Sequence, residues 1–171
     1  MISLLNFLTP KETKNRYIEE KYFDNHFEVN GALIKYQNYV VLGSLIDPSS
    51  VPLFLRNILV SYYDWVSFDK LNSLLKQVKN YLKSSNPTIV YVHCSAGVDR
   101  TGYVGGAYKM KYQKKSLSQV LDENLNILKG LRKNMHFNTY NGLQWYCLSL
   151  GRTEKECLIG EEKNFRKNNP K

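Results

Sequence analysis

A cysteine and an arginine with five residues between them, Cys94 and Arg100, form the most reactive arrangement in this chain of 171 residues. They belong to the segment 93–102, HCSAGVDRTG, which follows a short apolar run and precedes a segment with helical character. A loop between a strand and a helix N-terminus directs backbone N–H groups inward and lies at the positive end of the helix dipole. Such a loop binds anions, and a thiolate held there beside an arginine is suited to attack a phosphate ester.

Each residue type in this segment has a physical reason to be there. A helix N-terminus and a nearby cation lower the pKa of a thiol such as Cys94, which is about 8.5 when free. Arg100 presents a planar fork of donors that matches two phosphate oxygens. Gly97 gives the loop freedom to bend around a ligand. Thr101 can hydrogen-bond the sulfur and so make it a better leaving group, and we expect His93 to orient the loop and not to act as a base.

The pattern H-C-x-x-G-x-x-R-T-G resembles the signature loop of the protein tyrosine phosphatase superfamily, in its compact, dual-specificity-like form. The resemblance implies an α/β fold with a small, mostly parallel central sheet, helices on both faces, and the loop between a strand and a helix. It implies a phosphomonoesterase that acts through a cysteinyl-phosphate intermediate on protein phosphotyrosine, with or without phosphoserine and phosphothreonine. In this family Cys94 would be the nucleophile, and the phosphate would be held by Ser95, Ala96, Gly97, Val98, Asp99 and Arg100.

The leaving oxygen of a phosphate ester also needs a proton from a carboxylic acid. The family carries this acid on a loop upstream of the cysteine, and we assign it to Asp64, which stands 30 residues before Cys94. Asp69 is an alternative, although it could instead cap the following helix. Asp99 is a third candidate, because myotubularin-type lipid phosphatases carry an aspartate at the same loop position; it could instead form a structural hydrogen bond under the loop. The W-P-D pattern of the larger tyrosine phosphatases is absent.

Two weaker resemblances concern substrate recognition and water. The segment 14–17, KNRY, resembles the phosphotyrosine-recognition segment of the larger tyrosine phosphatases, in which the tyrosine ring walls a deep pocket. Gln144 falls where the family places a water-positioning glutamine loop, but beside Trp145 we expect it to pack in the core of a helix.

The charge of the chain favours anionic partners. Lysine and arginine number 24 against 15 aspartate and glutamate, for a formal net charge of +9. This favours a phosphoprotein substrate, with a phosphoinositide or a membrane surface as further partners. Nucleic acid is not favoured, because no RNA-binding motif is present. The oligomeric state is left open, and no metal or other cofactor is expected, because the three histidines are scattered.

The cysteine count and the hydropathy predict a cytoplasmic protein. The three cysteines, Cys94, Cys147 and Cys157, have no framework spacing, so we expect none of them to pair. Cys94 must stay reduced to act, which favours a reducing compartment. No apolar run approaches the roughly 20 residues of a membrane-spanning helix, and the N-terminus lacks the basic start and cleavage site of a signal peptide.

Elements expected along the chain place the loop in a single domain over 1–160, followed by a disordered tail over 161–171. Strands separated by helices, with a helical C-terminal half, predict the α/β class. We expect strands over 38–46, 57–62 and 88–92. We expect helices over 51–56, 68–82, 103–112, from Ser116 onward and over 138–150, with 11–20 either a helix or a loop.

Three other functions share the loop chemistry. Asp99 and the net charge suggest a phosphoinositide phosphatase, but Ser95 and Val98 are not basic, whereas lipid-selective relatives often carry lysine there. An RNA 5′-phosphatase is a second alternative, without a motif to support it. A pseudophosphatase that only binds phosphorylated ligands is a third; intact Cys94 and Arg100 argue against it, and the insecure acid keeps it open.

Overall fold

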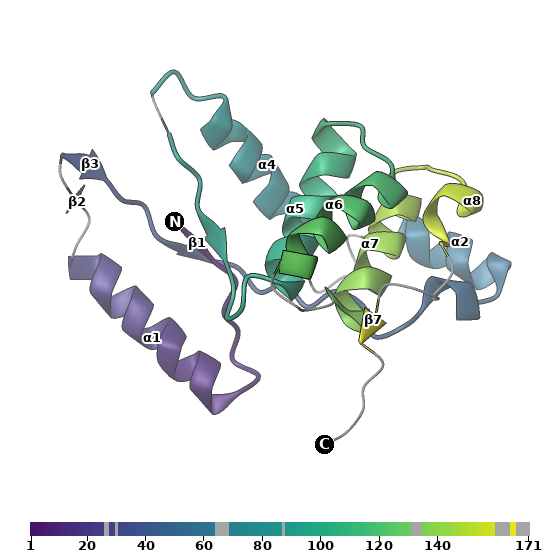
Figure 1. The fold of residues 1–171 in the computed structure, drawn as a ribbon, viewed down its shortest axis with the longest axis horizontal. Helices are drawn as coiled ribbons and strands as arrows, with labels where there is room; N and C mark the ends of the chain where they lie inside the picture. Colours follow the sequence, from purple (N-terminus) through teal and green to yellow (C-terminus); the bar gives the residue numbers. More distant parts are fainter. Residues whose placement is uncertain are drawn as a thin grey trace.

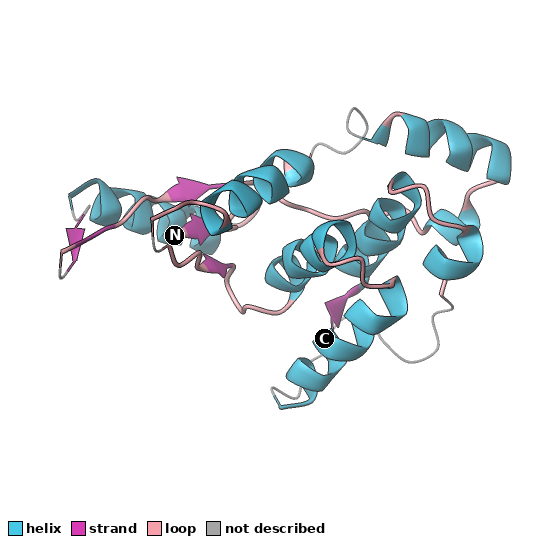
Figure 2. Cartoon of the chain, turned by 90° about the horizontal axis from the view of Figure 1, so that it is seen from above, coloured by secondary structure: helices cyan, strands magenta, loops and turns pink. Residues whose placement is uncertain are grey.

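A parallel three-stranded sheet and a larger group of helices make up the computed structural model, which describes residues 1–25, 28–29, 31–63, 69–86, 88–130, 135–159 and 165–166. The strands lie in the order β4 (Gln37–Asn38), β1 (Ile2–Ser3), β5 (Val92–His93), with Ile2 opposite both Gln37 and Val92. This confirms the α/β class and the parallel sheet. Seen from above, the sheet lies toward one end of the molecule, and helices dominate the rest (Figure 2).

The other elements are two pairs of short strands and helices of 4 to 16 residues. Strand β2 (Glu28–Val29) pairs antiparallel with β3 (Ala32–Leu33), and β6 (Met135–His136) pairs parallel with β7 (Phe165–Arg166). The helices are α1 (Pro10–Asn25), α2 (Leu53–Ser61), α4 (Leu71–Leu82), α5 (Asp99–Tyr112), α6 (Leu117–Gly130), α7 (Phe137–Ser149) and α8 (Glu154–Cys157), with a 3₁₀ turn η1 at Pro48–Ser50.

Helices α1 and α4 lie on opposite sides of the sheet (Figure 1). Side chains along a strand alternate between its two faces. Tyr36 hydrogen-bonds Glu19 of α1, whereas the next residue, Gln37, accepts a hydrogen bond from Tyr81 of α4. Lys35, on the same side as Gln37, lies over the Tyr81 ring. The alternation therefore places one helix on each face.

The core lies where α5 packs against α7. Tyr103 of α5 and Leu143 and Tyr146 of α7 are among its fully buried side chains. Every residue of α7 from Thr139 to Leu148 is buried, and a helix that is buried all round is surrounded by other elements. This core fixes the start of α5, and therefore the loop that leads into it.

Most of the predicted helices are present, but a predicted strand over 57–62 is wrong. The helix from Ser116 corresponds to α6, and those over 68–82, 103–112 and 138–150 correspond to α4, α5 and α7, while 11–20 lies within α1. Residues 57–61 belong to α2, which begins after Pro52, and Tyr62 is its C-cap. A short apolar run does not distinguish a buried strand from a buried helix, and here Leu59 and Val60 pack on the core from a helix.

The predicted strand over 38–46 is only partly present, because β4 ends at Asn38. Beyond it the chain leaves the sheet, and a side chain replaces the strand partner. The N–H groups of Leu42 and Gly43 donate to the Asp69 carboxylate at 2.7 and 3.0 Å. The predicted strand over 88–92 overlaps β5 at Val92, and of the tail over 161–171 the structure describes only Phe165–Arg166, as β7.

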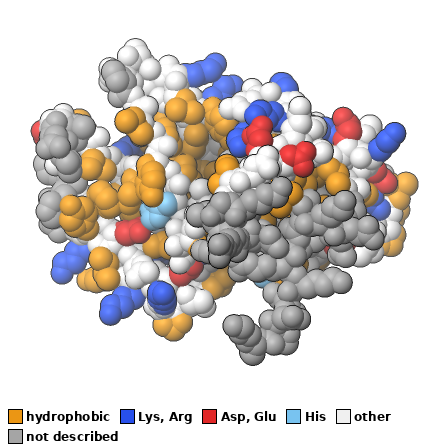
Figure 3. Space-filling view, in the orientation of Figure 1, with side chains coloured by type: hydrophobic (Ala, Val, Ile, Leu, Met, Phe, Trp, Pro, Cys, Tyr) orange, Lys and Arg blue, Asp and Glu red, His pale blue; other side chains and the backbone are white. Residues whose placement is uncertain are grey.

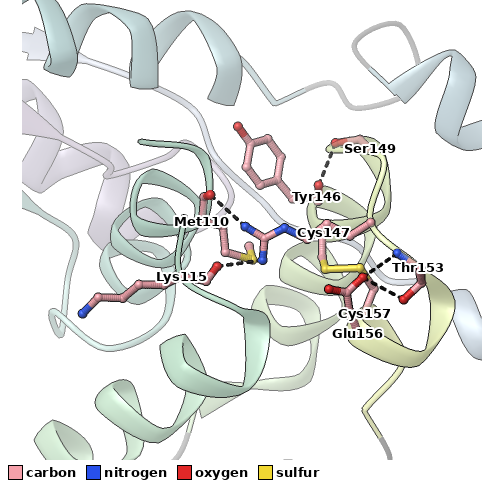
Figure 4. The surroundings of a disulfide bond; sticks show 9 residues. Met110, Lys115, Tyr146, Cys147, Ser149, Thr153, Glu156 and Cys157 are labelled. Carbon is pink, nitrogen blue, oxygen red and sulfur yellow. Dashed lines mark hydrogen bonds between the residues drawn. A yellow bond between two sulfur atoms is a disulfide. The ribbon is translucent and has the colours of Figure 1, made fainter. Parts of the chain in front are cut away.

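Cys147 and Cys157 form a disulfide, which corrects the expectation that no cysteines pair (Figure 4). Both are fully buried, and the bond ties α8 to α7. Arg152 lies between them in the sequence and donates to the carbonyl oxygens of Lys115 and Met110 at 2.7 and 2.9 Å, so α8 is also held against the end of α5.

The disulfide also removes one argument about location. Disulfides persist mainly in oxidising compartments, so the cysteines no longer support the cytoplasmic expectation. Within the described ranges, no helix combines the length and the apolar character needed to cross a bilayer.

Candidate active site

The loop between β5 and α5 curls around the thiol of Cys94. The Thr101 hydroxyl donates to Cys94 Sγ at 3.3 Å, the contact expected from the sequence. Backbone N–H groups of Ala96, Gly97 and Thr101 also hydrogen-bond the sulfur. Gly97 makes this curvature possible, because its φ of +67° lies in the left-handed region that other residues rarely adopt. The sulfur therefore sits in a ring of donors.

These donors decide the ionisation of Cys94. Burial raises the pKa of the thiol, but the hydrogen bonds from the Thr101 hydroxyl and from the loop amides stabilise the thiolate. The net effect is a pKa below the ordinary value for cysteine. Cys94 is free of any disulfide and 8% exposed, so it is a shielded thiol, and a lowered pKa is what a nucleophile at this position needs.

The side chain of Arg100 is held by hydrogen bonds to the N-terminal segment, at Leu4 and Glu12. Its Nη1 donates to the Leu4 carbonyl at 2.6 Å and to Glu12 Oε2 at 2.9 Å, and its Nη2 donates to Glu12 Oε1. A guanidinium has five N–H groups, and these contacts use three of them. Within the described part of the chain, Nε–H and the second Nη2–H have no acceptor. They lie on one edge of the guanidinium, the geometry that binds two oxygens of a phosphate.

Glu12 is a site residue that the sequence analysis missed. Its carboxylate also accepts the N–H of Asn6 at 3.2 Å, and the Glu12 and Arg100 side chains are only 13% and 15% exposed. Burial raises the pKa of Glu12, but the hydrogen bonds from Arg100 and Asn6 hold it below its ordinary value overall. Glu12 and Arg100 are 88 residues apart, and no local pattern signals a pair at that separation.

His93 and the inner face of α1 complete the surroundings of the loop. His93 Nε2 lies 3.6 Å from Glu19 Oε2, and its ring stacks on Tyr91. These contacts hold the strand that leads into the loop against α1, consistent with the positioning role expected for His93. The segment 14–17 lies in the middle of α1, and Tyr17 is 64% exposed. Its ring faces solvent, so the resemblance to a phosphotyrosine-recognition segment finds no support.

The structure describes the surroundings of two of the three candidates for the acid, Asp69 and Asp99. Asp64 lies outside the described residues. Asp69 does not cap α4, the alternative role considered for it: the N-cap of α4 is Lys70, and the Asp69 carboxylate accepts the N–H groups of Leu42 and Gly43. Asp99 Oδ1 accepts the N–H of His136 at 2.6 Å, which is the structural hydrogen bond considered as its alternative role. This bond anchors the first turn of α5 to β6.

Gln144 is 3% exposed within α7, in agreement with the expectation that it packs in the core. Among the described residues, no group of three or more histidine, cysteine, aspartate or glutamate side chains is arranged to hold a metal ion.

The chain matches no protein-family model, no curated protein and no solved structure. The functional argument therefore depends on the loop chemistry alone.

Proposed function

We propose that this chain is a cysteine-dependent phosphomonoesterase whose substrates are phosphotyrosine proteins, with or without phosphoserine and phosphothreonine. The observation that carries the proposal is the loop itself. A buried thiol with a lowered pKa lies in a ring of donors, and the arginine that ends the loop keeps one pair of N–H groups without an acceptor among the described residues. Both features serve one task, which is to bind a phosphate dianion and attack its phosphorus.

In the proposed reaction the Cys94 thiolate attacks phosphorus, and the bond from phosphorus to the ester oxygen breaks. The leaving oxygen takes a proton from the acid, which we assign to Asp64. Arg100 and the loop amides hold the non-bridging oxygens during transfer. The Asp64 carboxylate then takes a proton from a water molecule as that water attacks the phosphocysteine, which regenerates the acid; the sulfur–phosphorus bond breaks, and phosphate leaves. The Thr101 hydroxyl stabilises the departing thiolate, so its contact with Sγ serves both halves of the reaction.

A phosphoinositide is the second candidate substrate. Lys11 and Lys14 are exposed on α1, but residues one and two positions from Glu12 do not share its face of the helix, so neither lysine lies on the face that Glu12 turns to Arg100. On the face shown in Figure 3, basic side chains lie in separate groups at the upper and lower edges, with apolar side chains between them. The coloured part of this face therefore shows no single broad basic patch.

The test is a turnover panel with phosphotyrosine and phosphothreonine peptides, phosphoinositides and triphosphorylated RNA, with and without vanadate. We expect vanadate-sensitive release of phosphate from the phosphotyrosine peptide. Cys94→Ser should abolish turnover while tungstate binding survives, because the amides and Arg100 remain. Arg100→Lys should be severely impaired, because a point charge cannot bind two oxygens side by side. Turnover by Cys94→Ser would refute the covalent mechanism, and binding without turnover by the wild type would favour the pseudophosphatase.

A further inference from the structure

A cavity lies between α2, α5 and α7, with lining residues other than those of the Cys94 loop. Its volume is about 180 Å³. Its apolar wall is formed by Leu42 and Ile46 from the segment after β4, Leu59 from α2 and Trp145 from α7, and Asp69 also lines it. A mostly apolar cavity with one charged group is the usual form of a small-molecule site.

Asp69 is a buried carboxylate without a counter-ion in the described part of the chain. It is only 9% exposed, and none of the ion pairs found there includes it. It accepts the N–H groups of Leu42 and Gly43, and the Tyr103 hydroxyl lies close enough to lower its pKa. A carboxylate has about four acceptor positions, so the two amides leave roughly two of them for the Tyr103 hydroxyl or a ligand. Burial of a charge is costly unless an opposite charge joins it.

The backbone around Asp69 is built to hold this carboxylate in place. Gly43 has a φ of +75°, and a Cβ added there would collide with the carbonyl of Asn138 at the start of α7. Only glycine fits, and it lets two consecutive amides point at one carboxylate. Burial raises the pKa of Asp69, while the amides of Leu42 and Gly43 and the Tyr103 hydroxyl oppose that rise. On balance the pKa of Asp69 is raised, and a ligand cation beside the carboxyl group would favour its ionised form.

Aromatic side chains surround the carboxylate. Tyr63, Tyr103 and Trp145 all line the cavity, and the Tyr63 and Tyr103 hydroxyls are 3.0 Å apart. Either hydroxyl can be the donor in this pair. The acceptor oxygens at this end of the cavity come from the Asp69 carboxylate. Acceptors together with aromatic rings are the combination that recognises an organic cation.

We propose that this cavity binds a small primary ammonium compound, with the ammonium group on Asp69 and the apolar body against Leu59 and Trp145. An engineered cavity of about 150 Å³ holds a benzene molecule. The volume of about 180 Å³ therefore has room for one ring and a methylene ammonium group. The Asp69 cavity would bind a cation, whereas the Cys94 loop would bind an anion. The proposal for the cavity does not depend on the proposed phosphatase activity.

The experiment follows the backbone amides of Leu42, Gly43 and Gly142 by NMR during titration of the full chain with benzylammonium. Benzyl alcohol and benzoate serve as neutral and anionic ligands of the same shape. We expect a saturable shift with benzylammonium, binding at least about tenfold weaker with benzyl alcohol, and none with benzoate, because a hydrogen bond to a charged group is the main polar contact. Equal binding of the alcohol and the ammonium compound would overturn the proposal, as would the absence of saturation at millimolar concentrations.

Variants locate the site. Asp69→Asn should weaken benzylammonium binding at least about tenfold, because the isosteric amide lacks the charge. The matched control is Asp122→Asn, which removes an exposed carboxylate of α6 and should leave affinity unchanged. Because Asp69 also supports the backbone, Leu59→Trp, which fills the cavity from α2, is the independent variant. If Leu59→Trp keeps a native amide spectrum and still binds benzylammonium, the ligand lies elsewhere and the proposal is wrong.

Discussion

Replacing Glu12 with glutamine should reduce turnover without changing the nucleophile. The glutamine oxygen can keep one hydrogen bond from Arg100, but its NH₂ group then faces the other guanidinium nitrogen donor to donor. A hydrogen bond to a charged group contributes about 1.5–3 kcal/mol, and solvent screens this pair little, because the side chains are 13% and 15% exposed. If the transition state loses about 2 kcal/mol of stabilisation because Arg100 is no longer held in position, kcat/KM falls about 30-fold.

The opposite effect is also physically possible, and the assay distinguishes them. Removing the Glu12 charge would strengthen the Coulombic attraction between Arg100 and phosphate if Glu12 competed with the substrate. We expect orientation to dominate, because Glu12 uses the end of the guanidinium and leaves one edge to the phosphate. The assay is kcat/KM with a phosphotyrosine peptide, together with the pH dependence of Cys94 alkylation, which should not change. A kcat/KM that is equal to or above the wild-type value would refute the positioning role.

The matched control is Glu20→Gln. Glu20 lies on the same helix and pairs with Arg16 at 2.9 Å, with 38% of its side chain exposed. The substitution removes the same charge from α1 but no contact with the loop, so its kcat/KM should stay near the wild-type value. An equal loss in both variants would mean that the stability of α1, and not the orientation of Arg100, determines the rate.

Three further outcomes follow from the contacts around the site. Thr101→Val removes the hydroxyl donor from Cys94 Sγ, so the pKa of Cys94 should rise and the alkylation profile should move to higher pH; an unmoved profile would contradict the role of this bond. Asp64→Asn should slow a tyrosyl phosphate about 10²–10⁴-fold and an activated aryl phosphate far less; equal losses would show that the acid is another residue. Cys147→Ser should lower the free energy of unfolding by about 3 kcal/mol, since the disulfide closes a loop with a sequence separation of 10, and thermal unfolding without a change in Tm would show that the bond carries no stability.

Local sequence was sufficient for the features that depend on near neighbours. The spacing of Cys94, Gly97 and Arg100 between an apolar run and a helix predicted the loop, because hydrogen bonds such as that of Thr101 to Cys94 span only a few residues. The apolar period over 71–82 predicted α4 for the same reason. Where local pattern is ambiguous the prediction failed, as in the apolar run 57–62, of which residues 57–61 belong to α2.

Tertiary structure alone decided the contacts between distant parts of the chain. Glu12 meets Arg100 across 88 residues, and Asp69 meets the amide of Leu42 across 27 residues in place of capping α4. Cys147 and Cys157 are close in sequence, yet their pairing depends on the fold of α8 back against α7. A carboxylate takes whichever buried donors the packing brings to it, and hydrophobic periodicity contains no information on which donors those are. The sequence by itself therefore determined the reactive loop, and the fold decided which distant residues hold it in place: Leu4, Glu12 of α1 and His136 of β6.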